Sequence, residues 1–251
     1  MIQEWLKKSE SIPRKHGLYR MEAILSALGN PERELKNIHI AGTNGKGSTA
    51  AMVTAFAKAH GLRVGTFTSP HMDSIRERIQ LDGVPLEEEP FWQAATLVRE
   101  VENRLLEEWG AFNYFEILTA MMFVVFQQEA VDLAIIEVGI GGLLDNTNVG
   151  HPLVSVITTI GLDHQDLLGS TLEEITAQKA GIIKAGQQVV VGPVTRECMD
   201  VIRDTARQQG ATIQAFGENF LLVDDSYQDA SFTIPLEHLA LQGAFQKENA
   251  T

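Results

Sequence analysis

The stretch "NIHIAGTNGKGSTAAMVTAF" at residues 37–56 has the composition of a phosphate-binding loop. A short apolar segment leads into a glycine-rich turn that carries Lys46, and a run of good helix formers follows. Glycines let the backbone approach an anion, a helix start offers free N–H groups, and a lysine adds a charge that can reach phosphates. The spacing departs from G-x-x-x-x-G-K-[ST], because only two residues separate Gly42 from Gly45 and Gly47 stands ahead of Ser48. We expect a phosphate site here, against the alternative of an ordinary strand-turn-helix corner.

Glu137 is the next residue that could do chemistry, because it ends the apolar run Leu133–Ile136. Nucleotide-hydrolysing sheets place a carboxylate at such a strand end to hold Mg²⁺ directly or through water. Taken alone, the residue fits a turn hydrogen bond equally well, and the neighbouring phosphate loop favours the metal role. The glycines after it also suggest a dinucleotide-binding turn, but "GIGG" lacks the third spaced glycine of that motif.

Other polar residues near strand ends are ambiguous by type alone. His71 and His164 follow apolar segments, yet a lone histidine is more often a packing or hydrogen-bonding residue, and Mg²⁺ prefers oxygen donors. Ser69 precedes a proline and fits a turn. Lys179 fits a solvated lysine near a helix end, where its charge complements the helix dipole. The polar loop 145–148 fits ordinary turn chemistry.

The elements that must position these residues alternate between strand and helix patterns. Expected strands lie at 37–41, 62–68, 131–139, 153–161, 187–192 and 211–216, with a hairpin over 78–86 that turns at Asp82-Gly83. Expected helices run from a cap at Ser48-Thr49 to residue 60 and over 87–109, 114–128, 171–179 and 195–209. This order predicts an α/β fold with a doubly wound, mostly parallel sheet. Ligands of such sheets bind at the carboxyl ends of the strands, where the candidate residues fall.

Bulk properties restrict the partners. The 251 residues carry 20 basic and 33 acidic side chains, a net charge of −13, which argues against general binding to nucleic acid or an anionic membrane. The single cysteine, Cys198, cannot form an intrachain disulfide, and the amino terminus lacks the apolar core of a signal peptide. The ten-residue apolar run "ILTAMMFVVF" is too short to span a bilayer. We expect a cytoplasmic protein.

Taken together, five segments resemble the motifs of folylpolyglutamate synthase / dihydrofolate synthase, in the Mur ligase superfamily. They are "IHIAGTNGKGST", "TSPHMDSIRERI", "IIEVGIGGLLDNTNV", "ITTIGLDHQDLLGSTLEEITAQKAGIIK" and "LQGAFQKENA". The resemblance runs from about Gly17 to the last residue, and the family's phosphate loop resembles "GTNGKGS" rather than the usual spacing. It implies an ATP-dependent ligase that joins L-glutamate to a folate or dihydropteroate carboxylate through an acyl phosphate.

The resemblance also implies roles for single residues. ATP contacts would come from Gly42, Thr43, Asn44, Gly45, Lys46, Gly47, Ser48, Thr49 and Asn249. Mg²⁺, with two ions expected, would be held by Ser48, Ser69, Glu137, His164 and Lys179. Lys179 would be carbamylated, and Lys46, Lys179 and His164 would serve catalysis. The partners would be ATP, L-glutamate and folate or dihydropteroate, bound by a monomer.

Two residues and the length depart from the family pattern. The family commonly has arginine where this chain has Leu143 and glutamate where it has Gln178, which affects the substrate loop more than the metal ligands. We expect residues 1–251 to be the P-loop ATP-binding domain, with a core to about 240 and the start of a joining region at 241–251, and without the family's second α/β domain. Alternatives are an ATP- and Mg²⁺-binding module without turnover, or a P-loop kinase.

Overall fold

The computed structural model describes residues 1–13, 17–243 and 245–251. The helices are α1 (Ile2–Ser9), α2 (Tyr19–Ala27), α3 (Lys46–Ala59), the 3-10 helix η1 (Ile75–Arg78), α4 (Glu88–Trp109), α5 (Tyr114–Gln128), α6 (Gln165–Leu168), α7 (Leu172–Ala180), α8 (Arg196–Gln209) and α9 (Gln246–Ala250). The strands are β1 (Asn37–Ala41), β2 (Val64–Phe67), β3 (Ile79–Leu81), β4 (Val84–Pro85), β5 (Leu133–Glu137), β6 (Val154–Ile157), β7 (Gln188–Val191), β8 (Thr212–Ala215), β9 (Phe220–Val223), β10 (Ser226–Asp229) and β11 (Thr233–Pro235).

The main sheet confirms the expected fold class. Its eight strands run in the order β4-β3-β2-β5-β1-β6-β7-β8. The six strands β2-β5-β1-β6-β7-β8 pair in parallel, whereas the β2–β3 and β3–β4 pairs at one edge are antiparallel. β1 is central, with β5 and β6 as its two neighbours, so the carboxyl ends of these three strands lie side by side.

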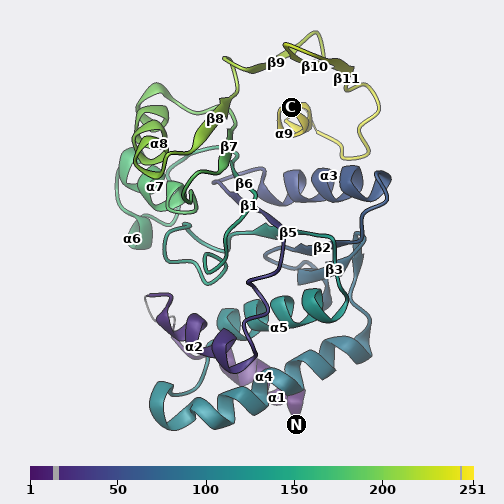
Figure 1. Cartoon of the computed structure of the whole chain (residues 1–251), viewed down its shortest axis with the longest axis vertical. Helices are drawn as coiled ribbons and strands as arrows, with labels where there is room; N and C mark the ends of the chain where they lie inside the picture. The colour runs from purple at the N-terminus through teal and green to yellow at the C-terminus, as the bar shows by residue number, and fades with distance from the viewer. Residues whose placement is uncertain (14–16, 244) are drawn as a thin grey trace.

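Helices cover both faces of this sheet (Figure 1). One face presents Ile40, Val64 and Ile135 to α3. On the other face, Phe67 and Ile136 pack in the largest core with α4 and α5, and Ile157 and Val191 pack with residues of α7 and α8. Successive side chains of β1 and β5 point to opposite faces of the sheet. Because helices cover both faces, the side chains on both faces are mostly apolar.

Most expected elements are present, and their ends follow local signals. α5 begins at Tyr114 as expected, since Asn113 and Glu116 form a capping box. The hairpin turns at Asp82-Gly83, where both residues have positive φ, as a two-residue hairpin turn requires.

One expected boundary is wrong: α3 begins at Lys46, and Gly45 with φ 86° stands at its cap in place of Ser48-Thr49. Because the turn is so tight, the helix starts inside the glycine-rich loop. The sequence reasoning also missed α1, α2, the short α6 and the small antiparallel sheet β11-β10-β9. Strands in that sheet have three or four residues each and are largely exposed, so they show no clear apolar alternation.

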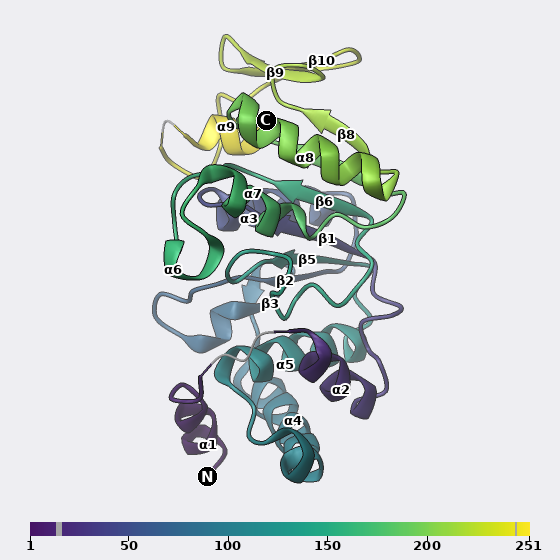
Figure 2. The same ribbon diagram turned by 90° about the vertical axis from the view of Figure 1, so that its left-hand side faces the viewer.

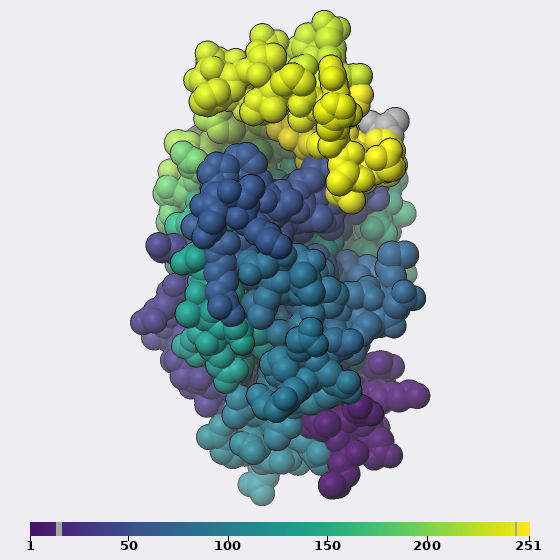
Figure 3. All heavy atoms as spheres, turned by 90° about the vertical axis from the view of Figure 1, so that its right-hand side faces the viewer, coloured from purple at the N-terminus to yellow at the C-terminus, as the bar shows by residue number. Residues whose placement is uncertain are grey.

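The carboxyl-terminal segment returns to the centre of the molecule. In Figure 2 the strands β9 and β10 lie at the end opposite the amino terminus. The space-filling view shows this yellow segment resting above the dark-blue α3 (Figure 3), and α9 contacts α3 directly. The expected joining region at 241–251 includes residue 244, which lies outside the described residues. Within the described part of the chain, no helix is long and apolar enough to cross a membrane.

Candidate functional site

The loop between β1 and α3 forms a nest of backbone groups at the carboxyl edge of the sheet. Gly42 has φ 150° and Gly45 has φ 86°, conformations that favour glycine. Thr43 N–H donates to Thr159 O (2.8 Å), and Thr158 Oγ1 donates to Asn44 O (2.6 Å), so the segment after β6 supports the loop. The first N–H groups of α3 have no acceptor within the helix. The loop is therefore built to receive an anion, despite its unusual spacing.

Two lysines converge on this loop. Lys46 Nζ donates to Gly42 O (3.0 Å) and Thr43 O (3.1 Å), and Lys179 Nζ reaches the same Gly42 oxygen from α7 (2.9 Å). Lys179 is 3% exposed, so it is not the solvated helix-end lysine that its sequence context allows. Burial and, to a lesser extent, the Lys46 charge lower the pKa of Lys179 to about 8, although the Asp163 charge acts in the opposite direction. An anion between the two amines would relieve their repulsion.

Glu137 lies beside the start of α3, at the end of β5. It is 4% exposed, and its Oε2 accepts Ser69 N–H at 3.0 Å. A Cβ added to Gly47 would lie 3.6 Å from the same oxygen, so the glycine leaves room next to the carboxylate. Burial raises the pKa of Glu137 to about 7, while the Ser69 N–H and the charges of Lys46 and Arg78 act in the opposite direction. Such a buried carboxylate is a natural ligand for a divalent cation.

His164 and His71 differ in their surroundings. His164 stands at the start of α6 with φ 48°, its side chain is about half exposed, and its Nε2 lies 3.6 Å from Asp163 Oδ2. His71 Nδ1 accepts a hydrogen bond from Arg78 Nε at 2.9 Å, which gives it the structural role expected of a lone histidine. Among the described residues, no group of three or more His, Cys, Asp or Glu side chains is assembled for a metal. A magnesium site here would draw on Glu137 together with hydroxyl and other donors.

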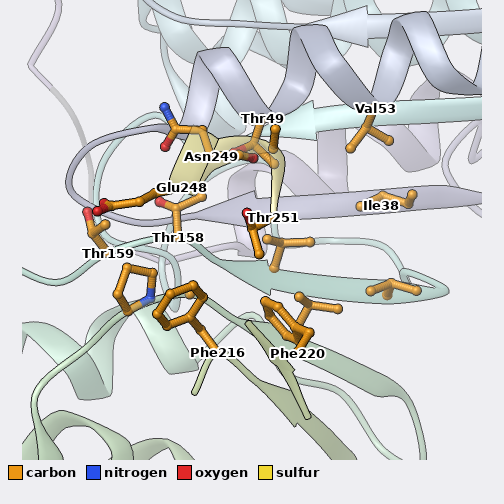
Figure 4. Close-up of a pocket in the computed structure, with 16 residues that line it drawn as sticks. Ile38, Thr49, Val53, Thr158, Thr159, Phe216, Phe220, Glu248, Asn249 and Thr251 are labelled. Carbon is orange, nitrogen blue, oxygen red and sulfur yellow. The ribbon is translucent and has the colours of Figure 1, made fainter. Parts of the chain in front are cut away.

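Asn249 brings the carboxyl-terminal segment onto the loop. A Cβ at Gly45 would overlap Asn249 Oδ1, and Thr49 Oγ1 donates to Asn249 O at 3.5 Å. Figure 4 shows Asn249 next to Thr49 at the rim of a cavity of about 280 Å³, with Phe216 and Phe220 on the opposite side. Asn249 is 200 residues from Thr49 in the chain. The fold thus brings the last predicted nucleotide residue to the phosphate loop.

Another cavity, of about 320 Å³, has Gln178, the neighbour of Lys179 in α7, among its lining residues. Its walls are Asn113 and Phe115 at the start of α5, the segment Ile140–Asn146 after β5, Leu167 and Leu168 of α6, and Gln178 of α7. The cavity combines an aromatic ring with amide and carboxylate groups. We name it the acceptor-side cavity.

The two departures from the family pattern meet at this cavity. Leu143 N–H donates to Gln178 O at 2.7 Å, and a Cβ at Gly181 would overlap the Leu143 side chain. Leu143 and Gln178 are therefore neighbours in space, and Gln178 lines the cavity.

Sequence reasoning missed several residues that build this region. Thr158 supports the phosphate loop, Arg78 contributes its charge near Glu137, and buried His39 contacts Thr147. The position of Thr158 directly after β6 was the one available signal, because the ends of central strands meet at the site. The partners of His39 and Arg78 are set by tertiary packing alone.

Residues 40–232 match the family described as the Mur ligase middle domain. The dihydrofolate synthase/folylpolyglutamate synthase of Bacillus subtilis (strain 168) is 37% identical over 259 residues, which cover 99% of this chain and 60% of that protein. The folylpolyglutamate synthase of Lacticaseibacillus casei is 38% identical, over 92% of this chain and 56% of that protein.

Solved structures give the same result. The apo form of L. casei folylpolyglutamate synthase superposes with a TM-score of 0.93 at 37% identity, covering 99% of this chain and 64% of that one. The Mycobacterium tuberculosis enzyme complexed with ADP and AMPPCP has a TM-score of 0.91 at 32% identity, covering 100% and 60%. The chain thus spans between 56% and 64% of the length of these relatives. The chain therefore belongs to the Mur ligase family, and within it the chain is similar to folylpolyglutamate and dihydrofolate synthases.

Proposed function

We propose that the chain binds ATP with Mg²⁺ and forms the nucleotide half of a ligase that joins L-glutamate to a folate or dihydropteroate carboxylate. The observation that carries this proposal is the convergence of Lys46 and Lys179 on Gly42 O, beside the buried Glu137 carboxylate. A lysine at a helix start, here Lys46, fits a polyphosphate, and a buried carboxylate beside it fits the cation of that polyphosphate. Lys179, which reaches the same point, would carry the modification proposed below. The relatives' structures with AMPPCP and folate support the same substrates.

The residues present fit magnesium. Glu137 would hold it with the hydroxyls of Ser48 and Ser69 and with His164, and Mg²⁺ would neutralise charge on the transferring phosphoryl group. Lys46 would donate hydrogen bonds to the phosphate oxygens. Asn249 and the free N–H groups from Gly45 to Ser48 would fix the nucleotide, so that its terminal phosphorus faces the acceptor.

Carbamylation of Lys179 is part of this proposal. The Lys179 ammonium would first lose a proton to water, and the neutral amine would then attack carbon dioxide, forming an N–C bond and losing a second proton. The two steps together convert a buried cation into an anion. An anion at this position could help to hold a second Mg²⁺, whereas a buried ammonium would repel it. The buried position facing Gly42 supports the modification.

We propose that the reaction on these residues has two steps. A carboxylate oxygen of the acceptor attacks the terminal phosphorus of ATP, the bond to ADP breaks, and an acyl phosphate forms. The amine of glutamate attacks the acyl carbon, phosphate leaves with that carboxylate oxygen, and the amine loses a proton to give the amide. The acceptor-side cavity, with the Phe115 ring and flanking amides, fits a flat heterocycle with hydrogen-bonding edges.

The relatives are longer than this chain, so we propose that turnover needs a second domain like the remaining part of those proteins. We propose further that the protein acts as a monomer in the cytoplasm, where ATP is available. An ATP-binding module without turnover is the second candidate.

An isotope experiment tests the ligase. The chain is joined to the remaining part of the L. casei relative and given ATP, Mg²⁺, L-glutamate and an acceptor whose carboxylate carries ¹⁸O. Released phosphate should contain one ¹⁸O, and its release should require glutamate. Phosphate without ¹⁸O, or release driven equally by a simple alcohol, contradicts the ligase and favours hydrolysis or a P-loop kinase. Nucleotide binding by the fused protein without any amide product supports the module.

A further inference from the structure

Residues of the segment from Ile140 to Asn146 form a wall of the acceptor-side cavity, and Thr147 and Asn148 continue the same segment behind it. The segment lies outside the helices and strands. Hydrogen bonds hold its shape instead. The Asp145 carboxylate accepts from Ile140 N–H (3.0 Å) and Thr147 N–H (3.1 Å), which closes the segment into a loop. Asn148 Nδ2 donates to Leu143 O (3.0 Å) and to Gly181 O (3.1 Å). The wall is therefore a self-bonded loop that is also tied to the end of α7, through Asn148 and through the hydrogen bond from Leu143 N–H to Gln178 O.

The Thr147 hydroxyl also connects this loop to β1, the central strand of the sheet. Thr147 Oγ1 lies 2.6 Å from Asp145 Oδ1 and 2.8 Å from His39 Nε2. All three side chains are 2–3% exposed. A carboxylate oxygen only accepts, so the Thr147 proton points to Asp145, and the Thr147 oxygen accepts the proton of His39 Nε2. Each donor in the series His39, Thr147 and Asp145 therefore has an acceptor.

His39 suits this role because it is neutral. Burial lowers the pKa of His39 to about 3, and the nearby Lys184 charge adds to the effect. Lys184 Nζ also lies 3.4 Å from Asn148 O, at the end of the same loop. A neutral imidazole protonated on Nε2 is the form that can donate to Thr147. His39 also stands in β1, three residues ahead of Gly42 of the phosphate loop.

We propose that His39, Thr147 and Asp145 form a positioning relay that fixes the acceptor-side wall relative to the phosphate loop. The proposal rests on the proposed function, because it assumes that the acceptor binds in this cavity. The acceptor carboxylate must reach the terminal phosphorus, and a misplacement of about 1 Å can cost roughly 100-fold in rate. The relay connects β1, which leads into the phosphate loop, to the loop that faces the acceptor. The positions of both substrates would therefore be fixed relative to the same strand.

The relay predicts a selective defect. Thr147→Val removes the hydroxyl at nearly constant shape, whereas Thr147→Ser keeps it. Thr119→Val is a matched control, because the buried Thr119 hydroxyl has no hydrogen-bond partner within the described part of the chain. Amide hydrogen exchange of residues 140–148 is measured, together with the affinity for AMPPCP with Mg²⁺ and for tetrahydrofolate and dihydropteroate in its presence.

For Thr147→Val we expect about 10-fold faster exchange in the loop and about 10-fold weaker acceptor binding, the size of one lost buried hydrogen bond. AMPPCP affinity should stay within about 2-fold, and Thr147→Ser and Thr119→Val should match the unmodified chain. His39→Asn interrupts the relay at its other end and should show the same selective loss, which covers the case in which Thr147→Val does not fold.

Unchanged acceptor affinity in Thr147→Val and His39→Asn would overturn the relay. An equal loss in Thr147→Ser or Thr119→Val would also overturn it, since the effect would then be general core disruption. If the unmodified chain binds AMPPCP but neither acceptor, the acceptor part of the proposed function fails, and the relay's role toward the acceptor fails with it. The exchange measurement still reports separately whether the hydroxyl anchors the loop.

Discussion

Lys179 and Lys184 lie five residues apart, and burial lowers the pKa of both amines. Only Lys179 is nearly inaccessible to solvent and faces the phosphate loop. Carbon dioxide reacts with the neutral amine, and a pKa of about 8 leaves a substantial neutral fraction near neutral pH. The two lysines therefore form a matched pair for testing carbamylation.

In ¹³C-bicarbonate with Mg²⁺ and AMPPCP, we expect one carbamate resonance in the NMR spectrum of the chain. It should grow as pH rises from 7 toward 9, because deprotonation of Lys179 frees the reactive amine around its pKa of about 8. Lys179→Ala should abolish the resonance and Lys184→Ala should keep it. A signal that survives Lys179→Ala would assign the carbamate elsewhere and remove Lys179 from the proposed metal ligands.

His39 makes stability depend on pH. Its pKa is about 3 in the folded chain against an ordinary 6.5, so between these values the unfolded state binds a proton that the folded state does not. The free energy of unfolding should fall as pH drops through this window, by up to about 1.4 kcal/mol per pH unit from this group. His39→Asn should flatten that part of a urea-unfolding series. An unchanged slope would show that the buried imidazole accepts a proton readily.

At the scale of elements, the turn between β1 and α3 depends on Gly42. An added Cβ would overlap the Thr158 hydroxyl, and the φ of 150° is strained for other residues. Gly61 offers a control, because it also has positive φ but has open space around its Cβ position. Gly61→Ala should cost only the backbone strain, about 1–2 kcal/mol, and keep AMPPCP binding. Gly42→Ala should cost more in urea unfolding and lose AMPPCP binding; equal effects would contradict the close contact with Thr158.

The junction of α2 and α5 is held by a buried ion pair. Arg20 binds Glu116 (Nε to Oε1, 2.7 Å) and also donates to Trp109 O and to Ala111 O. Arg20→Met should destabilise by about 3–5 kcal/mol in urea unfolding, because it leaves Glu116 buried without its cation. Adding Glu116→Leu should recover part of that loss. The exposed pair Arg203–Glu218 is the control, and Arg203→Met should cost less than about 1 kcal/mol. A fully additive double variant would argue against the pair as a unit.

Local signals explain which elements were predictable. β1 and α5 have clear apolar periods and end signals, and their observed bounds agree with expectation. The start of α3 was misplaced because Ser48 and Thr49 are typical cap residues, while the real cap, Gly45, acts through a positive φ that composition does not specify. Glu137 could be inferred from the strand-end rule. The buried orientation of Lys179 could not, since it depends on the packing of α7 against the loop.

At the scale of the whole molecule, the chain is acidic although its proposed substrates are anions, and positive charge that could bind them is gathered at one place. The chain carries a net charge of −13, yet two lysines and a helix start meet at one point of the sheet edge. His39 and Thr147 show the limit of sequence reasoning at this scale, because they are 108 residues apart and meet only in the folded chain. Asn249 contacts Thr49 beside the loop across a larger gap in sequence, 200 residues.

The central claim is that this loop, with its unusual spacing, binds Mg²⁺ and ATP through Lys46 and Glu137. Calorimetric titration of AMPPCP into the chain tests it directly, with and without Mg²⁺. We predict binding that strengthens with Mg²⁺, is lost in Lys46→Ala, and loses its dependence on Mg²⁺ in Glu137→Gln. Absence of binding, or binding that Lys46→Ala and Glu137→Gln leave unchanged, would contradict the account.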